Sequence, residues 1–182
     1  MKYNLENLIK DFNSKKKLKF LFFWGHTEKE NEITKACFSQ WYNCKFIVNN
    51  ITYHTAEQYM MAQKALLFND NEIFNRIMNS KHPKEYKELG RKIKSFSDSK
   101  WNENKYQIVL KGNIAKFFQN NQLKKFLLNT GTRILVEASP YDKIWGIGLS
   151  ADQENIENPL TWNGENLLGF ALMEVRDLLN KN

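Results

Sequence analysis

The sequence predicts an α+β fold, in which a single helix-rich domain contains a few short strands. The first observation is length, because 182 residues suit one domain with a buried core of its own. The second is composition: 42% hydrophobic and 26% charged residues are ordinary for a globular protein and exclude a disordered chain. The third is pattern, since helical stretches dominate and the short apolar runs typical of strands are few and dispersed.

The first third of the chain is expected to form one helix and three short strands. Residues 1–17 predict a short helix followed by a charged connector. The run 20–24 is short, aromatic and ended by a glycine, which predicts a buried strand. Two further runs within 46–53 predict a hairpin, because the Asn49-Asn50 pair that joins them tolerates positive φ.

The clearest helix start in the sequence is at Thr55. Thr55 stands three residues before Gln58, the capping-box spacing at which each side chain can bind the other residue's backbone N–H. No helix-breaking residue follows for twelve positions, so we expect a helix over 56–67.

Three more helices are expected before residue 119. Asp70 can cap the first, Pro83 can open the second, and Asp98 can cap the third. The expected ranges end near Met78, near Lys94 and at about Phe118.

The last third is expected to alternate between helix, strand and loop. A helix over 121–129, stopped at a glycine, is followed by a strand over 133–137 and a loop over 139–148. A polar insertion over 151–161 precedes a terminal amphipathic helix over 167–179. No repeat or linker divides the chain, so we expect an N-terminal extension over 1–19 and one domain over 20–182.

The net charge of +7 permits a nucleic-acid interpretation, but a simpler one is favoured. The basic residues are nearly all lysines, and they are scattered apart from a cluster at 15–19. The chain is also rich in Asn, Ile and Lys, as AT-biased coding would produce on any surface. We therefore interpret most of the charge as a solvated surface, with attraction of phosphorylated ligands as the alternative.

Membrane, secreted and metal-binding classes are not favoured. No apolar run approaches the roughly 20 residues of a membrane helix, and none fits a signal peptide, so a cytoplasmic protein without membrane association is expected. Cys37 and Cys44 lack CxxC spacing and are expected to be reduced structural thiols. The three histidines are far apart and form no metal-binding pair, so we expect no metal site.

Glu57 and Lys64 form the first candidate site. They are seven residues apart on one expected helix, so they share a face with roughly 10 Å between their Cα atoms. A carboxylate and an amine in this arrangement can reach a small ligand from two sides. The alternative is a surface pair on a helix packed by Met60 and Met61, and spacing alone favours that alternative. Phosphate-binding loops, dinucleotide fingerprints and nucleophile elbows are absent.

Two loops near the C-terminus are further candidates. Asp142 and Trp145 lie on a tight loop after an expected strand, where functional side chains are commonly presented. Trp162 and Asn166 lie between glycines that permit close backbone approach. Each loop is equally well explained by turn formation plus a core tryptophan, and Trp101 is more simply a core residue.

Taken together, these residues resemble the NADAR (YbiA-like) family over about residues 20–180. The matching strings follow the family's order: Phe22-Phe-Trp24-Gly25, Phe38-Ser39, Tyr53-His-Thr-Ala-Glu57-Gln-Tyr-Met-Met-Ala-Gln-Lys64-Ala, Leu89-Gly90-Arg91, Trp101, Lys116-Phe117-x-Gln119-Asn120, Leu128-x-Thr-Gly131, Leu135-Val-Glu137, Asp142-x-x-Trp145-Gly146, Trp162-x-Gly-x-Asn166-Leu-Leu-Gly169 and Leu172-Met-x-Val-Arg176.

The resemblance implies an N-glycosidase, a hydrolase of ribosyl C–N bonds that uses no metal or cofactor. Substrates attributed to the family are phosphorylated intermediates of riboflavin biosynthesis and ADP-ribosylated guanine, in a nucleotide or in nucleic acid. The expected partner is therefore a small phosphorylated ribosyl or ADP-ribosyl substrate. The alternative is a module that binds ADP-ribose or a related nucleotide without cleaving it, and the third is a nucleic-acid-binding protein.

Carried onto this chain, the resemblance supplies roles for the candidate residues. Lys64 is expected to be a nucleophile that forms a Schiff base, Glu57 an acid/base and Asp142 a second carboxylate. Trp101 and Trp145 are expected to stack on the base or sugar, and Arg91 is expected to bind phosphate. The full substrate-binding set is Trp24, Gly25, Arg91 (for phosphate), Trp101, Trp145 and Asn166.

Overall fold

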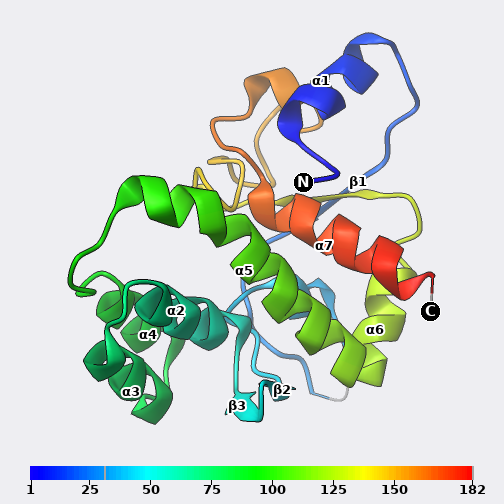
Figure 1. The fold of residues 1–182 in the computed structure, drawn as a ribbon. Coiled ribbons are helices and arrows are strands. Elements are labelled where there is room, and N and C mark those ends of the chain that lie inside the picture. The colour runs from blue at the N-terminus through cyan, green and yellow to red at the C-terminus, as the bar shows by residue number, and fades with distance from the viewer. Residues whose placement is uncertain (31, 182) are drawn as a thin grey trace. The chain divides into compact units, whose positions relative to one another are not determined.

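The computed structural model describes residues 1–30 and 32–181 (Figure 1). Contacts group the chain into two compact units, which are described separately. Unit 1 comprises 1–39 and 121–182, and unit 2 comprises 40–120. Helices dominate both and the strands are short, so the expected helix-rich α+β class is confirmed.

Unit 2 is built around α2, which packs against the other three helices of the unit. A short antiparallel hairpin precedes α2 and pairs Phe46 with Tyr53, as the sequence predicts. The elements of unit 2 are β2 (Phe46–Val48), β3 (Ile51–Tyr53), α2 (Ala56–Leu67), α3 (Asn71–Asn79), α4 (Pro83–Gly90) and α5 (Asp98–Gln119).

The start of α2 confirms the expected cap, with one shift. The Thr55 hydroxyl accepts a hydrogen bond from the Gln58 N–H at 3.0 Å. The Gln58 side chain accepts from the N–H of His54, at 2.8 Å, one residue earlier than the capping box prescribes. The last residue of β3 and the first turn of α2 are thereby joined almost without a loop.

Two glycines let neighbouring helices approach α2 closely. A Cβ on Gly90 of α4 would lie 2.2 Å from the Met61 sulfur, and one on Gly112 of α5 would lie 2.5 Å from a ring carbon of Tyr59. At position 112 the contact is with a buried ring, which excludes a side chain, whereas a side chain at position 90 would require the flexible Met61 side chain to move.

Two helix ends differ from the expectation. Pro83 opens α4, but the helix ends at Gly90 rather than near Lys94. The N–H of Lys94 instead donates to the Asp70 carboxylate at 2.9 Å, which draws the segment 91–97 toward the start of α3. At α5 the cap is Ser97, whose hydroxyl accepts from the Lys100 N–H at 3.4 Å, and Asp98 is the first residue of the helix.

Unit 1 contains a two-stranded parallel sheet, with β1 paired to β4 in the register Phe20 to Ile134 through Phe23 to Glu137. The sequence predicts both strands but not this pairing. Helix α7 packs against β4 and against α6. The elements are α1 (Leu5–Asn13), β1 (Phe20–Phe23), η1 (Lys35–Phe38), α6 (Asn121–Leu128), β4 (Ile134–Glu137), η2 (Pro159–Thr161) and α7 (Leu167–Leu179).

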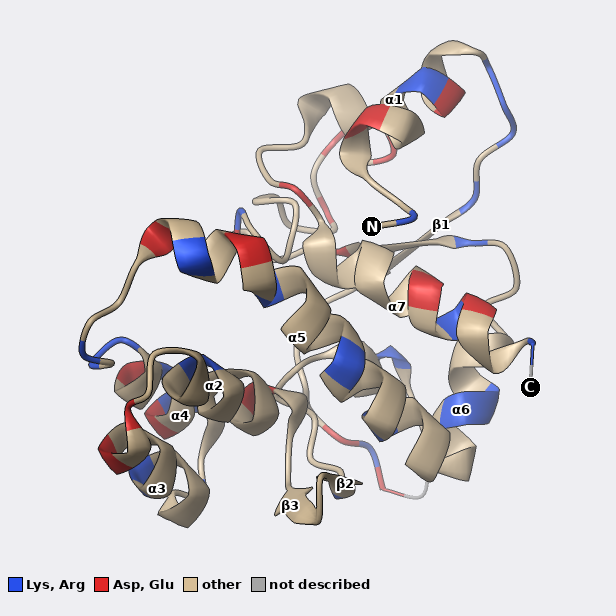
Figure 2. Ribbon diagram, in the orientation of Figure 1, with Lys and Arg blue, Asp and Glu red and all other residues tan. Residues whose placement is uncertain are grey.

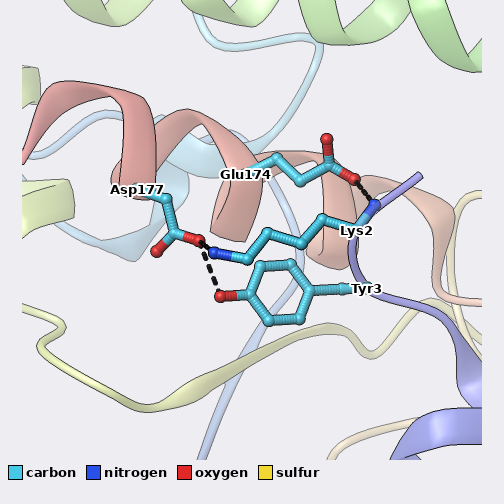
Figure 3. A network of polar contacts seen from close by, with 4 residues as sticks. All are labelled: Lys2, Tyr3, Glu174 and Asp177. Carbon is cyan, nitrogen blue, oxygen red and sulfur yellow. Dashed lines mark hydrogen bonds and ion pairs between the residues drawn. The ribbon is translucent and has the colours of Figure 1, made fainter. Parts of the chain in front are cut away.

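The N-terminal extension is part of unit 1. Helix α1 packs against η2. Ahead of α1, the backbone N–H of Lys2 donates to Glu174 and its amine pairs with Asp177, which also accepts from the Tyr3 hydroxyl at 2.7 Å (Figure 3). The start of the chain is thus tied to the last turns of α7.

Acidic and basic residues alternate along the helices. On α5, for example, Asp98 and Glu103 are interspersed with Lys100 and Lys105, and α7 carries both signs (Figure 2). This distribution agrees with the solvated-surface interpretation of the net charge. Among the described residues, no helix combines the length and the apolar character needed to cross a bilayer.

Candidate active site

Lys64 lies in a half-buried position on the last turns of α2. Its amine donates a hydrogen bond to the carbonyl oxygen of Gly90 at 2.9 Å. That carbonyl belongs to the last turn of α4, where helix carbonyls have no intrahelical donor. The amine also lies 4.3 Å from the ring centroid of Phe96 and 5.3 Å from that of Trp101. One carbonyl and two aromatic rings therefore surround the nitrogen.

The surroundings of Lys64 favour loss of its proton. Burial is the largest influence and lowers the pKa of Lys64 below its usual value of 10.5. The carboxylates of Asp98 and Glu57 act in the opposite direction, and the guanidinium of Arg91 lowers the pKa further. The net direction is downward, as a nucleophilic amine requires.

Glu57 occupies the first turn of α2 and is only 4% exposed. Its backbone N–H donates to the Gln40 carbonyl at 2.8 Å. The Gln40 side-chain amide donates in turn to Asn113 of α5 at 3.3 Å, and both of these residues are buried. A polar cluster thus adjoins the carboxylate-bearing turn of a helix that is otherwise packed by apolar residues.

Unit 2 brings together four of the predicted site residues. Glu57 and Lys64 share α2, Arg91 follows α4, and Trp101 lies on the first turns of α5. Arg91 is exposed, and its positive charge lowers the pKa of Lys64. Trp101 is half-buried, with its ring toward the amine. The surface-pair alternative for Glu57 and Lys64 is wrong, because Glu57 is buried and Lys64 half-buried.

Unit 1 places the remaining predicted residues in loops beside its parallel sheet. Trp24 and Gly25 directly follow β1, and Asp142 belongs to the loop after β4. Because the carboxyl ends of parallel strands meet at one edge, these loops are neighbours. The exposed rings of Trp24 and Tyr141 lie 6.2 Å apart, centroid to centroid, at that edge.

The loop after β4 is shaped by Asp142. One of its carboxylate oxygens accepts from the N–H groups of Ile144 at 2.9 Å and Trp145 at 2.8 Å. This geometry is an Asx turn, and it presents Asp142 and Trp145 as half-buried side chains. The core-tryptophan explanation suits Trp162 instead, since that residue is buried and its indole N–H donates to the Ile156 carbonyl at 2.8 Å.

Asn166 binds the main chain of β4 just before this loop. Its side-chain oxygen accepts from the Glu137 N–H at 3.0 Å, and its amide donates to the Leu135 carbonyl at 2.9 Å. The residue is fully buried and adopts positive φ at the start of α7. Asn166 therefore fixes the end of β4, the position from which the Asp142 loop departs.

Phe96 and Gly90 were missed by sequence reasoning. Gly90 lies within one of the matching strings, but it contributes only its main-chain carbonyl, which accepts from the Lys64 amine, and side-chain patterns do not reveal such a contact. Phe96 lies in a short segment between two helices, and no periodicity marks it. The available signal is a large aromatic residue directly before the exposed cap of a helix, Ser97.

A surface depression elsewhere on unit 2 does not coincide with these residues. It lies between α3 and α4 and is lined by both basic and acidic side chains, including Arg76, Glu85 and Lys92. None of the predicted site residues lines it. In the described parts of the chain, no three His, Cys, Asp or Glu side chains form a group able to hold a metal ion.

Comparison with known proteins gives consistent matches. The model of the NADAR domain family matches residues 22–180. N-glycosidase R617 of Acanthamoeba polyphaga mimivirus is 45% identical over 164 residues, covering 87% of this chain and 95% of that protein. N-glycosidase YbiA of Escherichia coli K12 is 32% identical over 132 residues, covering 72% of this chain and 74% of that protein.

A solved structure agrees. The NMR structure of Escherichia coli YbiA matches with a TM-score of 0.70 at 26% identity, covering 90% of this chain and 86% of that one. The family match spans nearly the whole chain and confirms the resemblance that the motifs predict. The chain therefore belongs to the NADAR domain family, as an enzyme of the N-glycosidase class.

Proposed function

We propose that the chain hydrolyses the C–N bond between a ribose-derived carbon and a nitrogen base, with Lys64 as the nucleophile and Glu57 as the acid/base. The proposed substrates are phosphorylated intermediates of riboflavin biosynthesis or ADP-ribosylated guanine, as a nucleotide or within nucleic acid. The observation that carries the proposal is the Lys64 amine: half-buried, bonded to Gly90 and covered by two rings.

A neutral amine in this position can attack a sugar carbon. One N–H of the amine continues to donate a hydrogen bond to the Gly90 carbonyl. The lone pair is available because burial disfavours the charged form of the amine. A charged ammonium has no lone pair and cannot act in this way. The lowered pKa of Lys64 is therefore the property that the mechanism needs.

Ring opening comes first in the proposed sequence. Glu57 gives a proton to the ring oxygen, the bond between that oxygen and C1 breaks, and the lone pair of the base nitrogen completes a C1–N double bond. The Lys64 amine then adds to C1 and passes a proton to the base nitrogen. The base leaves with that proton, and Lys64 holds C1 as a protonated imine.

Water completes the reaction. It adds to C1 and one proton returns to Glu57, with Asp142 as the second carboxylate that orients the water. The new hydroxyl group at C1 passes its proton to the Lys64 nitrogen as the bond between C1 and that nitrogen breaks, which restores the neutral amine and releases the open-chain sugar as an aldehyde. One water is consumed, and each proton transfer is assigned to a side chain or the base, so no metal is invoked.

The other predicted residues are proposed to hold the substrate. Arg91 is exposed beside the amine and suits a phosphate group, because a guanidinium can bind two phosphate oxygens at once. Trp101 and Trp145 are proposed to stack on the base or sugar, and Trp24 and Gly25 to contact the substrate. Asn166 supports the Asp142 loop through its bonds to β4.

The test is a product assay with a matched pair of lysine variants. The protein is incubated with riboflavin-pathway ribosylamines, ADP-ribosylated guanosine and an ADP-ribosylated oligonucleotide, and free base and sugar are measured by chromatography. Lys64→Met should abolish turnover, at least 1,000-fold by order of magnitude, because no amine remains to form the imine. Lys100→Met, an exposed lysine on α5, should keep it.

Two results would contradict the proposal. Binding without product from any member of the panel would favour the non-catalytic ADP-ribose module. Turnover by Lys64→Met within about tenfold of the unmodified chain would remove the imine route while leaving the N-glycosidase class in place.

A further inference from the structure

Phe96 is a large apolar side chain in the exposed segment between α4 and α5, and it remains 40% exposed. Its ring lies over the Lys64 amine at 4.3 Å, closer than the 5.3 Å of Trp101. We propose that Phe96 and Trp101 form an aromatic cage that shields the Lys64 amine from water before the reaction and stabilises the cationic imine formed on it. The inference rests on the proposed function and adds Phe96 as a positioning residue.

The position of Phe96 is fixed by contacts made elsewhere in unit 2. The Asp70 carboxylate caps α3 through the Ile73 N–H at 3.0 Å and accepts from the Lys94 N–H at 2.9 Å. The ring of Phe68, at the end of α2, packs on Phe96 with centroids 5.1 Å apart. One carboxylate therefore holds the main chain of the segment, and one buried ring holds the side chain.

Charged neighbours influence the pKa of Lys64 in both directions. Glu57 on α2 and Asp98 on α5 favour the ammonium, whereas Arg91 at the end of α4 opposes it. Burial is the largest of these influences on the pKa of Lys64. Phe96 and Trp101 are the two rings that lie over the nitrogen, so removing one of them should admit water directly to it.

The two parts of the cage's role come from different properties of a phenyl ring. Any apolar side chain of similar size excludes water from the neutral amine. Only an aromatic ring presents the negative face that attracts a cation. The neutral amine gains little from that face, but the protonated imine carries a positive charge on the same nitrogen. Relative to the neutral amine that attacks the sugar, the attraction therefore appears once the intermediate forms, which is where it accelerates the reaction; the resting ammonium is attracted to the same face.

Three substitutions separate these properties. Phe96→Leu keeps an apolar cover and loses the aromatic face, Phe96→Tyr keeps both, and Phe96→Ala loses both. Phe118→Leu is the matched control, because Phe118 on α5 is 39% exposed and lies outside the cage. Thermal unfolding of each variant shows that it is folded before comparison.

The first measurement needs no substrate. The rate at which acetic anhydride labels Lys64 is followed from pH 6 to pH 11 by peptide mass spectrometry, which gives the pKa of the amine. Phe96→Ala should raise that pKa, Phe96→Leu should not raise it because the apolar cover remains, and Phe96→Tyr and Phe118→Leu should leave it unchanged. An unchanged pKa in Phe96→Ala would overturn the shielding part of the proposal.

The second measurement traps the imine itself. Ribose 5-phosphate in its aldehyde form and the Lys64 amine, with one proton, give the protonated imine and water; cyanoborohydride then donates hydride to C1 and leaves a stable secondary amine. At pH 7, Phe96→Leu should slow the appearance of this adduct by about 3- to 30-fold, and Phe96→Tyr should restore it.

The outcomes are distinguishable from failure of the proposed function. Equal trapping rates in Phe96→Leu and the unmodified chain would overturn the cation-stabilising part of the proposal. Absence of any adduct on Lys64 in the unmodified chain would overturn both the imine route and that part, while the labelling experiment would still decide whether Phe96 shields the amine.

Discussion

At Lys64, the nucleophile proposed above, the proposed function and the stability of the fold make opposite demands. A folded state that lowers the pKa of a lysine disfavours its proton, so the unfolded chain binds that proton more tightly. The folded chain therefore loses stability at neutral pH, and the loss is relieved as the pH rises from the native pKa toward 10.5. Lys64→Met removes this penalty and fills the same space. We expect the inactive variant to unfold at a melting temperature no lower than that of the unmodified chain.

The pH dependence of activity should follow the same residue. If the neutral amine is required, kcat/KM rises with pH through the pKa of Lys64, at a pH below 10.5. Arg91→Met removes a cation that lowers this pKa and should move the rise to higher pH. Asp98→Asn removes an anion that raises it and should move the rise to lower pH. Shifts of the same sign in both variants would contradict the role of Lys64.

At the scale of secondary-structure elements, the contact between α2 and α5 depends on a missing side chain. The Cβ of an alanine at position 112 would lie 2.5 Å and 3.0 Å from two ring carbons of Tyr59, which is 1% exposed. We expect Gly112→Ala to lower the free energy of unfolding by about 1–3 kcal/mol, because overpacking exceeds the ~1 kcal/mol that alanine gains in a helix. Urea denaturation measures this, with Lys111→Ala, one exposed residue earlier, as the control.

Elements defined by local chemistry could be predicted from the sequence. The Thr55 cap, the Asn49-Asn50 hairpin and the terminal helix depend on residues within a few positions of one another, and all three are confirmed. The pairing of β1 with β4 joins segments more than one hundred positions apart, and neither strand alone specifies its partner.

The candidate site shows the same division. Glu57 and Lys64 could be placed on one helix face because their spacing is local. The end of α4 and the position of Phe96 could not be predicted, because both depend on a bond from Lys94 to Asp70, 24 residues earlier. For Glu57 and Lys64, spacing alone favours a surface pair, and the roles proposed for them follow from the family resemblance.

For the molecule as a whole, ionisable groups tie the first residues of the chain to the last turns of α7. Burial alone would raise the pKa of Asp177, but hydrogen bonds from Lys2 and Tyr3 outweigh it, so the pKa is lowered. A carboxyl group with a lowered native pKa stabilises the fold above its unfolded pKa and loses that contribution as the pH falls through the native value.

This anchor gives a prediction for unfolding in acid. We expect Asp177→Asn to lower the melting temperature at pH 7 and to have a smaller effect near pH 2, because the carboxyl of the unmodified chain becomes protonated as the pH falls through its native pKa, below 3.8. Differential scanning calorimetry across this range makes the comparison. Glu174→Gln is the partner variant, since Glu174 accepts from the backbone of Lys2 rather than from its amine. An equal loss at both pH values would contradict the ionic anchor.

Unit 2 is one uninterrupted stretch of chain that leaves unit 1 after residue 39 and returns at residue 121. Glu57, Lys64, Arg91, Phe96 and Trp101 all belong to it, whereas Asp142 and Trp145 belong to the surrounding segments. A single pair of crossovers can therefore exchange the whole environment of the Lys64 amine between relatives while the recipient keeps its own residues at positions 142 and 145. Evolution, or a protein engineer, can therefore vary the surroundings of Lys64 and the loops of unit 1 independently.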